Sequence, residues 1–145
     1  MSSVSLCVRH GERADHVQDC PFDNKSDPQL TPTGIEQAKK TGLFLKEYFA
    51  SNNLSFSSIT IECSPFVRCK MTAAQIALHL GVQKVRINYL ASELLCTHLF
   101  DEDPVSKIYH LNGGDSKGYL PEGIEFENSD FYKQEILAAF PENDQ

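Results

Sequence analysis

The chain has 145 residues, of which 41% are hydrophobic, and this size and composition predict a single globular domain. Its 13 basic and 20 acidic residues give a net charge of −7, which disfavours non-specific binding to nucleic acid or to an anionic membrane. Any anion site in this protein therefore requires a local concentration of positive charge.

The first half of the chain is predicted to begin with a strand, a loop and a helix. Residues 3–8 are apolar on both sides of the pleat, which is typical of a buried central strand. A polar loop over 11–30 follows. Thr31 and Pro32 are typical of a helix N-terminus, and apolar residues then recur at helical spacing to about Ala50.

A second strand is predicted over 58–62 and a third over 85–89, with a helix between them. Ser64 and Pro65 open this helix, whose apolar stripe ends at Gly81. The alternation of strands and helices predicts a mostly parallel central sheet with helices on its faces, a three-layer α/β/α fold. In such sheets, ligands collect at the carboxyl ends of the strands.

Beyond residue 90 the pattern is less regular. The stretch 91–128 is rich in turn-forming residues and is predicted to be an insertion or a lid, and residues 129–140 are predicted to form a last helix. Because the sequence contains no internal repeat or linker, we predict one domain over 1–145.

The N-terminus and the cysteines indicate a cytoplasmic protein. The first residues lack a basic stretch followed by an apolar core, and no run approaches the roughly 18 apolar residues of a membrane span. The five cysteines are odd in number and irregularly spaced, so we expect reduced thiols. No CxxC or HxxxH pair occurs, and neither a metal nor a cofactor is predicted.

Positive side chains are predicted to meet at the carboxyl edge of the sheet. His10 directly follows the first predicted strand between Arg9 and Arg13, and Arg68 lies in the first turn of the helix after the second strand. Guanidinium groups bind phosphoryl oxygens in a bidentate manner, and the N-terminal amides of a helix add positive potential. This pattern predicts a phosphate-sized pocket.

His10 is a candidate nucleophile within this pocket. Neighbouring arginines lower the pKa of an imidazole, which keeps the ring neutral and leaves one nitrogen free to attack phosphorus. Gly11 has no side chain and so allows the backbone to approach the ring or the phosphate closely. Two simpler interpretations stay open, in which Arg13 is a surface charge of the loop and Arg68 is a solvated charge of the helix.

Three motifs in register carry a family resemblance. They are VRHGER at residues 8–13 with Asp15, LTPTGIEQAKKTG at residues 30–42 and ECSPFVRCKMTAAQIA at residues 62–77. Together they resemble the histidine phosphatase superfamily, also called phosphoglycerate mutase-like, whereas Arg-His-Gly alone would be a weak signal. The resemblance implies a phosphoglycerate mutase-like fold and phosphoryl transfer through a phosphohistidine.

The resemblance also implies roles for individual residues. His10 would accept the phosphoryl group, and Arg9 and Arg68 would hold it with the assistance of Arg13. Glu93 lies where the family keeps the acid that protonates the leaving oxygen.

Two points of this assignment stay open. The acidic residues 101–103 follow Glu93 closely, and Glu93 itself is alternatively an ordinary exposed carboxylate. At the position of Arg13 the mutases carry a small hydroxyl residue. The arginine resembles the phosphatases related to the suppressor-of-T-cell-signalling proteins and ecdysteroid-phosphate phosphatase, so a phosphomonoesterase is favoured over a mutase.

One departure from the family concerns the C-terminal part. Family members carry a second pocket histidine on a later strand that pairs with the first one, and this chain ends before that strand, so we expect a C-terminally truncated domain. Residues 3–8 would then form an open sheet edge, which invites self-association. The chain is interpreted as a fragment, as a protein completed by a partner, or as an inactive phosphate-binding or protein-binding remnant. The expected substrate is a phosphorylated small molecule or a phosphoprotein.

Overall fold

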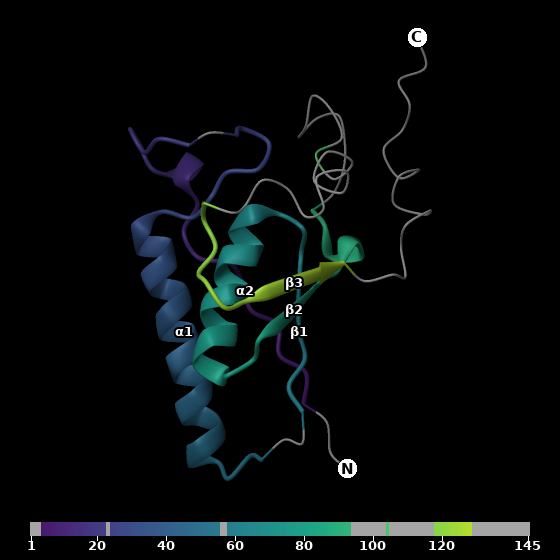
Figure 1. The fold of residues 1–145 in the computed structure, drawn as a ribbon. Helices are drawn as coiled ribbons and strands as arrows, with labels where there is room; N and C mark the ends of the chain where they lie inside the picture. The colour runs from purple at the N-terminus through teal and green to yellow at the C-terminus, as the bar shows by residue number, and fades with distance from the viewer. Residues whose placement is uncertain (1–3, 23, 56–57, 94–103, 105–117, 129–145) are drawn as a thin grey trace.

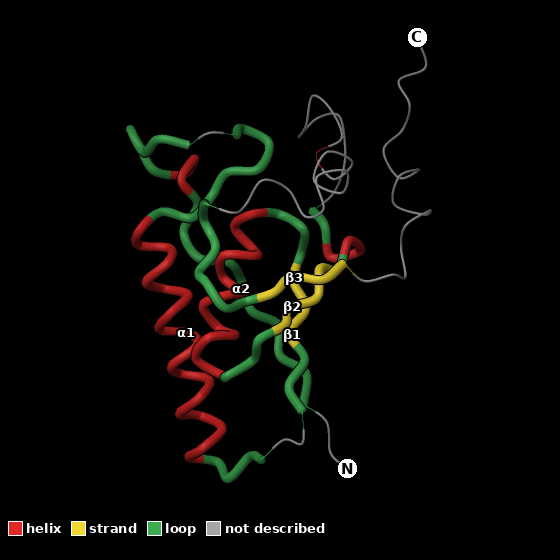
Figure 2. The backbone as a smooth tube through the Cα atoms, in the orientation of Figure 1, coloured by secondary structure: helices red, strands yellow, loops and turns green. Residues whose placement is uncertain are grey.

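The computed structural model describes residues 4–22, 24–55, 58–93, 104 and 118–128. A parallel sheet in the order β1-β2-β3 lies on one side of two long helices, with α2 between α1 and the sheet (Figure 1). The elements are η1 (Ala14–His16), α1 (Pro32–Ser51), β1 (Ile61–Cys63), α2 (Val67–Leu80), β2 (Lys84–Ile87), η2 (Tyr89–Ala91) and β3 (Glu125–Asn128). Figure 2 shows that the loops and turns link these helices and strands at both ends of the sheet. The predicted α/β class is confirmed.

Helix α1 begins where the sequence indicates. The hydroxyl oxygen of Thr31 accepts a hydrogen bond from the Gly34 N–H at 2.9 Å, and Pro32 occupies the first helical position. The buried positions recur every three or four residues, and they are Gly34, Ala38, Gly42 and Leu45. The helix predicted over 31–50 is therefore confirmed.

Helix α2 packs against both α1 and the sheet. It ends at Gly81, whose φ of 71° lies in the left-handed region that favours glycine at a helix C-terminus. Small side chains let it approach the sheet closely, because Ala73 and Ala77 pack against Cys63 of β1 and Val85 of β2. This packing confirms the second predicted helix, although it begins at Val67 and not at Ser64.

The sheet is parallel throughout the described residues. Val85 in the central strand β2 pairs with Ile61 of β1 and Phe126 of β3. The strands predicted over 58–62 and 85–89 are present but displaced by a few residues, and Tyr89 belongs to η2.

Strand β3 was not expected from the sequence. It pairs with β2 within the stretch 91–128, and its exposed Glu125 and Glu127 leave Phe126 as its one large apolar residue. A strand of this composition gives little periodic signal. The assignment of the remainder of 91–128 to an insertion or lid stays a prediction, and the helix predicted over 129–140 lies outside the described residues.

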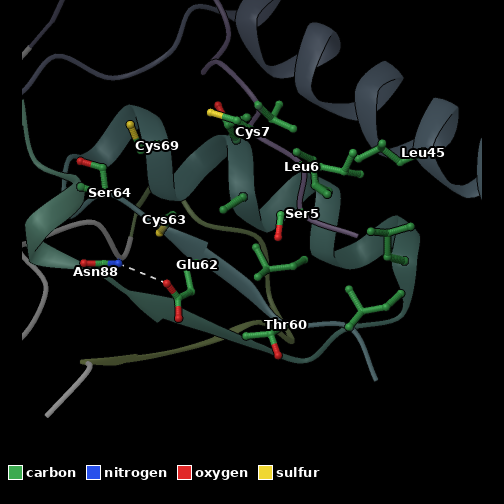
Figure 3. Close-up of a pocket in the computed structure, with 18 of the residues that line it drawn as sticks. Ser5, Leu6, Cys7, Leu45, Thr60, Glu62, Cys63, Ser64, Cys69 and Asn88 are labelled. Carbon is green, nitrogen blue, oxygen red and sulfur yellow. Dashed lines mark hydrogen bonds between the residues drawn. The ribbon is translucent and has the colours of Figure 1, made fainter. Parts of the chain in front are cut away.

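The prediction of a strand over 3–8 is wrong for residues 4–8, which join no strand of the described sheet. Their apolar side chains are exposed, with Val4 at 51%, Leu6 at 53% and Val8 at 41%. A cavity of about 840 Å³ separates this segment from residues 58–64 and the free edge of β1 (Figure 3). A strand that is apolar on both faces is stabilised by strands on either side and by helices over both faces, and within the described residues no strand pairs with this segment.

Two glycines bring the loop after this segment against the start of α1. A Cβ on Gly11 would lie 2.3 Å from the carbonyl oxygen of Gly34, and a Cβ on Gly34 would lie 2.4 Å from that of Glu12. Hydrogen bonds fix the contact, because the Glu12 N–H donates to Oε1 of Gln37 and the Thr31 N–H donates to the Glu12 carbonyl. The loop is therefore held on the N-terminus of α1.

Neither described helix is long and apolar enough to cross a membrane.

Replacing Gly34 by alanine is expected to destabilise the protein by about 1–3 kcal/mol, because the added methyl group collides with the Glu12 backbone. The gain in helix propensity of about 1 kcal/mol offsets only part of this loss. A Cβ on Gly118 meets nothing within 4 Å among the described residues, so Gly118→Ala should change the free energy of unfolding by less than about 0.5 kcal/mol. Urea denaturation measures both variants, and equal stabilities would contradict the close approach.

Candidate active site

The imidazole of His10 is half-buried and held in one orientation. Its Nδ1 lies 2.8 Å from the carbonyl oxygen of Gly11. A proton on Nδ1 satisfies this acceptor, and in the neutral ring Nε2 then keeps a free lone pair. Burial lowers the pKa of His10 below its ordinary value of 6.5, and the charges of Arg68, Arg13 and Arg9 lower it further, while the bond to Gly11 opposes them. His10 is therefore a neutral imidazole with an available nitrogen.

Arg68 points into the protein and not into solvent, with a side chain that is only 4% exposed. Its Nη2 donates to Oε2 of Glu93 at 2.6 Å, and its Nη1 lies 3.7 Å from Oδ1 of Asp27. The guanidinium carbon lies 4.4 Å from the centroid of the Phe66 ring, a cation–π contact. Its charge lowers the pKa of His10, so the predicted nucleophile lies within the electrostatic reach of the predicted clamp.

Thr72 joins the loop of His10 to the helix that carries Arg68. Its hydroxyl accepts a hydrogen bond from the Gly11 N–H at 3.2 Å and donates one to the Arg68 carbonyl oxygen at 2.9 Å. Sequence reasoning missed this residue, although a threonine one turn after an arginine on an otherwise apolar helix is a visible signal. The backbone of Gly11 approaches the His10 ring through its carbonyl oxygen, as predicted, and it also approaches the backbone of Gly34, while its approach to a phosphate stays a prediction.

The other two predicted arginines are placed differently. Arg13 makes a bidentate contact with Asp15, in which Nε lies 3.0 Å from Oδ1 and Nη2 lies 2.7 Å from Oδ2. Its donors are thus engaged by its own loop. Arg9 is exposed and lines the cavity beside the N-terminal segment. Both act on His10 through their charge, and their roles in phosphate binding stay predictions.

Asp27 is a buried carboxylate that sequence reasoning missed. Its Oδ1 accepts a hydrogen bond from the Val67 N–H, the first amide of α2, at 2.9 Å. Burial raises the pKa of Asp27, and the Val67 hydrogen bond and the charges of Arg68 and Lys70 oppose that rise. Because the contact joins residues 40 positions apart, no local pattern in the polar loop indicates it.

Cysteine side chains from three segments border the cavity next to His10. Figure 3 shows Cys7 of the N-terminal segment, Cys63 of β1 and Cys69 of α2 among its lining residues. Burial raises the pKa of Cys63 to about 12 and also raises that of Cys69, so both thiols stay protonated and are poor nucleophiles. Among the described residues, no group of three or more His, Cys, Asp or Glu side chains is arranged to hold a metal ion.

Comparisons with known proteins agree with this arrangement. The model of the histidine phosphatase superfamily (branch 1) matches residues 6–93. A 2,3-bisphosphoglycerate-dependent phosphoglycerate mutase of Sinorhizobium fredii is 26% identical over 117 residues, which are 81% of this chain and 49% of the mutase. The crystal structure of an ecdysone phosphate phosphatase from Bombix mori, in complex with tungstate, gives a TM-score of 0.50 at 18% identity and covers 81% of this chain and 54% of the phosphatase.

These likenesses differ in what they show. The chain spans about half the length of the mutase and of the phosphatase. The structural neighbour confirms the phosphoglycerate mutase-like α/β fold. The family match covers more than half of the chain and includes His10, Arg68 and Glu93. On the strength of this match, the chain belongs to the histidine phosphatase superfamily.

Proposed function

We propose that this chain carries the catalytic site of a metal-independent phosphomonoesterase whose nucleophile is His10. The single observation that supports the proposal best is the orientation of the ring, in which the contact of Nδ1 with the Gly11 carbonyl leaves Nε2 available while the charge of the buried Arg68 guanidinium acts on the imidazole. The substrate class is a phosphorylated small molecule or a phosphoprotein, as expected from the sequence.

The reaction proceeds in two steps. In the first, Nε2 of His10 attacks phosphorus, the bond from phosphorus to the alcohol oxygen breaks, and Glu93 protonates that oxygen. In the second, the oxygen of a water molecule attacks the phosphohistidine, the bond from phosphorus to Nε2 breaks, and Glu93 takes the proton of that water, which releases inorganic phosphate and free His10. The Nδ1–H bond to the Gly11 carbonyl orients the ring and stabilises the positive charge that develops on it. Arg68 stabilises the charge on the phosphoryl oxygens.

Hydrolysis is favoured over mutase chemistry by the residue at position 13. The family resemblance associates an arginine there with phosphatases and a small hydroxyl residue with mutases. The Arg13 side chain packs against Asp15 in the loop beside His10, where it adds bulk and positive charge. These features support water, and not a second phosphorylated metabolite, as the acceptor.

A second candidate function is a phosphate-binding or protein-binding module without turnover. The exposed apolar side chains of Val4, Leu6 and Val8 support it, because no strand of the described sheet pairs with the segment before His10 and about half of each side chain is open to solvent. Such a surface suits a second copy of the chain or another protein. In this alternative the arginines bind an anion that is not hydrolysed.

Hydrolysis of p-nitrophenyl phosphate separates the two candidates. We expect His10→Ala to lower kcat/KM by about 10³-fold or more, because the nucleophile is lost. The control His16→Ala removes an exposed imidazole from the same loop and should retain the activity. Equal rates for the unchanged chain and His10→Ala would contradict the enzyme, and phosphate binding without hydrolysis would identify the binding module.

A further inference from the structure

The Arg68 guanidinium has two N–H donors on one edge, at Nε and Nη2, and among the described residues only Nη2 donates a hydrogen bond. Two parallel N–H donors on this edge are what an arginine offers to a carboxylate or a phosphate. Nη2 donates to Oε2 of Glu93 at 2.6 Å, whereas the buried Nε has no hydrogen-bond partner within the part of the chain that the structure describes. Arg13 shows the complete arrangement, because its Nε and Nη2 both contact Asp15. One of the two donors on this edge of Arg68 is therefore unused among the described residues, and a bidentate partner would satisfy both.

We propose that Glu93 is an exchangeable internal anion, whose carboxylate is displaced from Arg68 by the phosphoryl oxyanion of the substrate. The incoming group takes both Nε–H and Nη2–H, in place of the single bond that Glu93 accepts. This inference rests on the proposed function and names a residue that sets the anion affinity of that same site.

Displacement is required because solvent barely reaches Arg68. Its side chain is 4% exposed, with the Phe66 ring against the guanidinium and Asp27 beside Nη1. Glu93 covers Nη2 and is itself 42% exposed at its side chain. An anion that arrives from solvent thus reaches the guanidinium through the space that the Glu93 carboxylate leaves.

The two carboxylates beside Arg68 differ in how easily they move. Asp27 is 11% exposed at its side chain and accepts the Val67 N–H, so its departure would leave the first amide of α2 without this acceptor. Glu93 is able to rotate into solvent, where a carboxylate is well hydrated, and a partly exposed ion pair stabilises little. Asp27 is therefore the fixed partner of Arg68 and Glu93 the exchangeable one.

The exchange also prepares Glu93 for proton transfer. Once displaced, its carboxylate is free of Arg68 and lies beside the bound phosphoryl group. The leaving oxygen requires an acid at this place. Binding of the substrate and release of Glu93 are in this way coupled through Arg68.

Calorimetric titration with inorganic phosphate tests the proposal without relying on turnover. Glu93→Gln removes the competing charge at nearly constant size, and we expect phosphate to bind about three- to tenfold more tightly. The control Glu47→Gln makes the same change of net charge on an exposed position of α1, sixteen residues beyond its N-cap, and should bind like the unchanged chain. In an Arg68→Lys background the gain from Glu93→Gln should disappear, because lysine lacks the two-donor edge.

The outcomes separate this inference from the proposed function. Phosphate binding that is equal or weaker in Glu93→Gln overturns the exchange and leaves the phosphate site in place. An equal gain in Glu47→Gln, or in the Arg68→Lys background, also overturns it, because the effect would then be one of overall charge. Absence of phosphate binding in every variant removes the phosphate site and the exchange together.

Discussion

The site depends on one buried positive charge. Placing a guanidinium at 4% exposure is costly unless opposite charges and hydrogen bonds compensate it, and Asp27, Glu93 and the Phe66 ring do so around Arg68. The same charge lowers the pKa of His10, together with burial, and so helps to keep the ring neutral. Structure and chemistry are thus linked, because the group that would bind a phosphoryl oxygen also prepares the nitrogen that would attack it.

Short backbone contacts hold this arrangement in place. The loop that carries His10 lies on α1 through the facing glycines Gly11 and Gly34, and it is joined to α2 by the hydroxyl of Thr72. Asp27 binds the first amide of α2 from a loop remote in sequence. The loop of His10 is therefore held by α1 and by α2 together. Against this fixed frame, Glu93 is the exposed and exchangeable group.

Much of this was predictable from the sequence, and the exceptions have physical causes. Both long helices carry strong local signals, in the N-cap Thr31 and the C-terminal Gly81, and the place of Arg68 in the first turn of the helix after β1 follows from the alternation of strands and helices. Strand β3 was not predicted because Phe126, its one large apolar residue, is only partly buried and is flanked by exposed glutamates. Asp27 and the facing glycines act through tertiary contacts, which no local pattern encodes. The strand predicted over 3–8 is absent at residues 4–8, because no strand of the described sheet pairs with them.

The protonation of the His10 ring tests the central claim most directly. Nitrogen NMR of the imidazole distinguishes a proton on Nδ1 from one on Nε2, and a pH titration gives its pKa. The account predicts a neutral ring at neutral pH with the proton on Nδ1 and a pKa below the ordinary 6.5. A proton on Nε2, or a pKa above that value, would contradict it, because the nitrogen needed for attack would then be blocked.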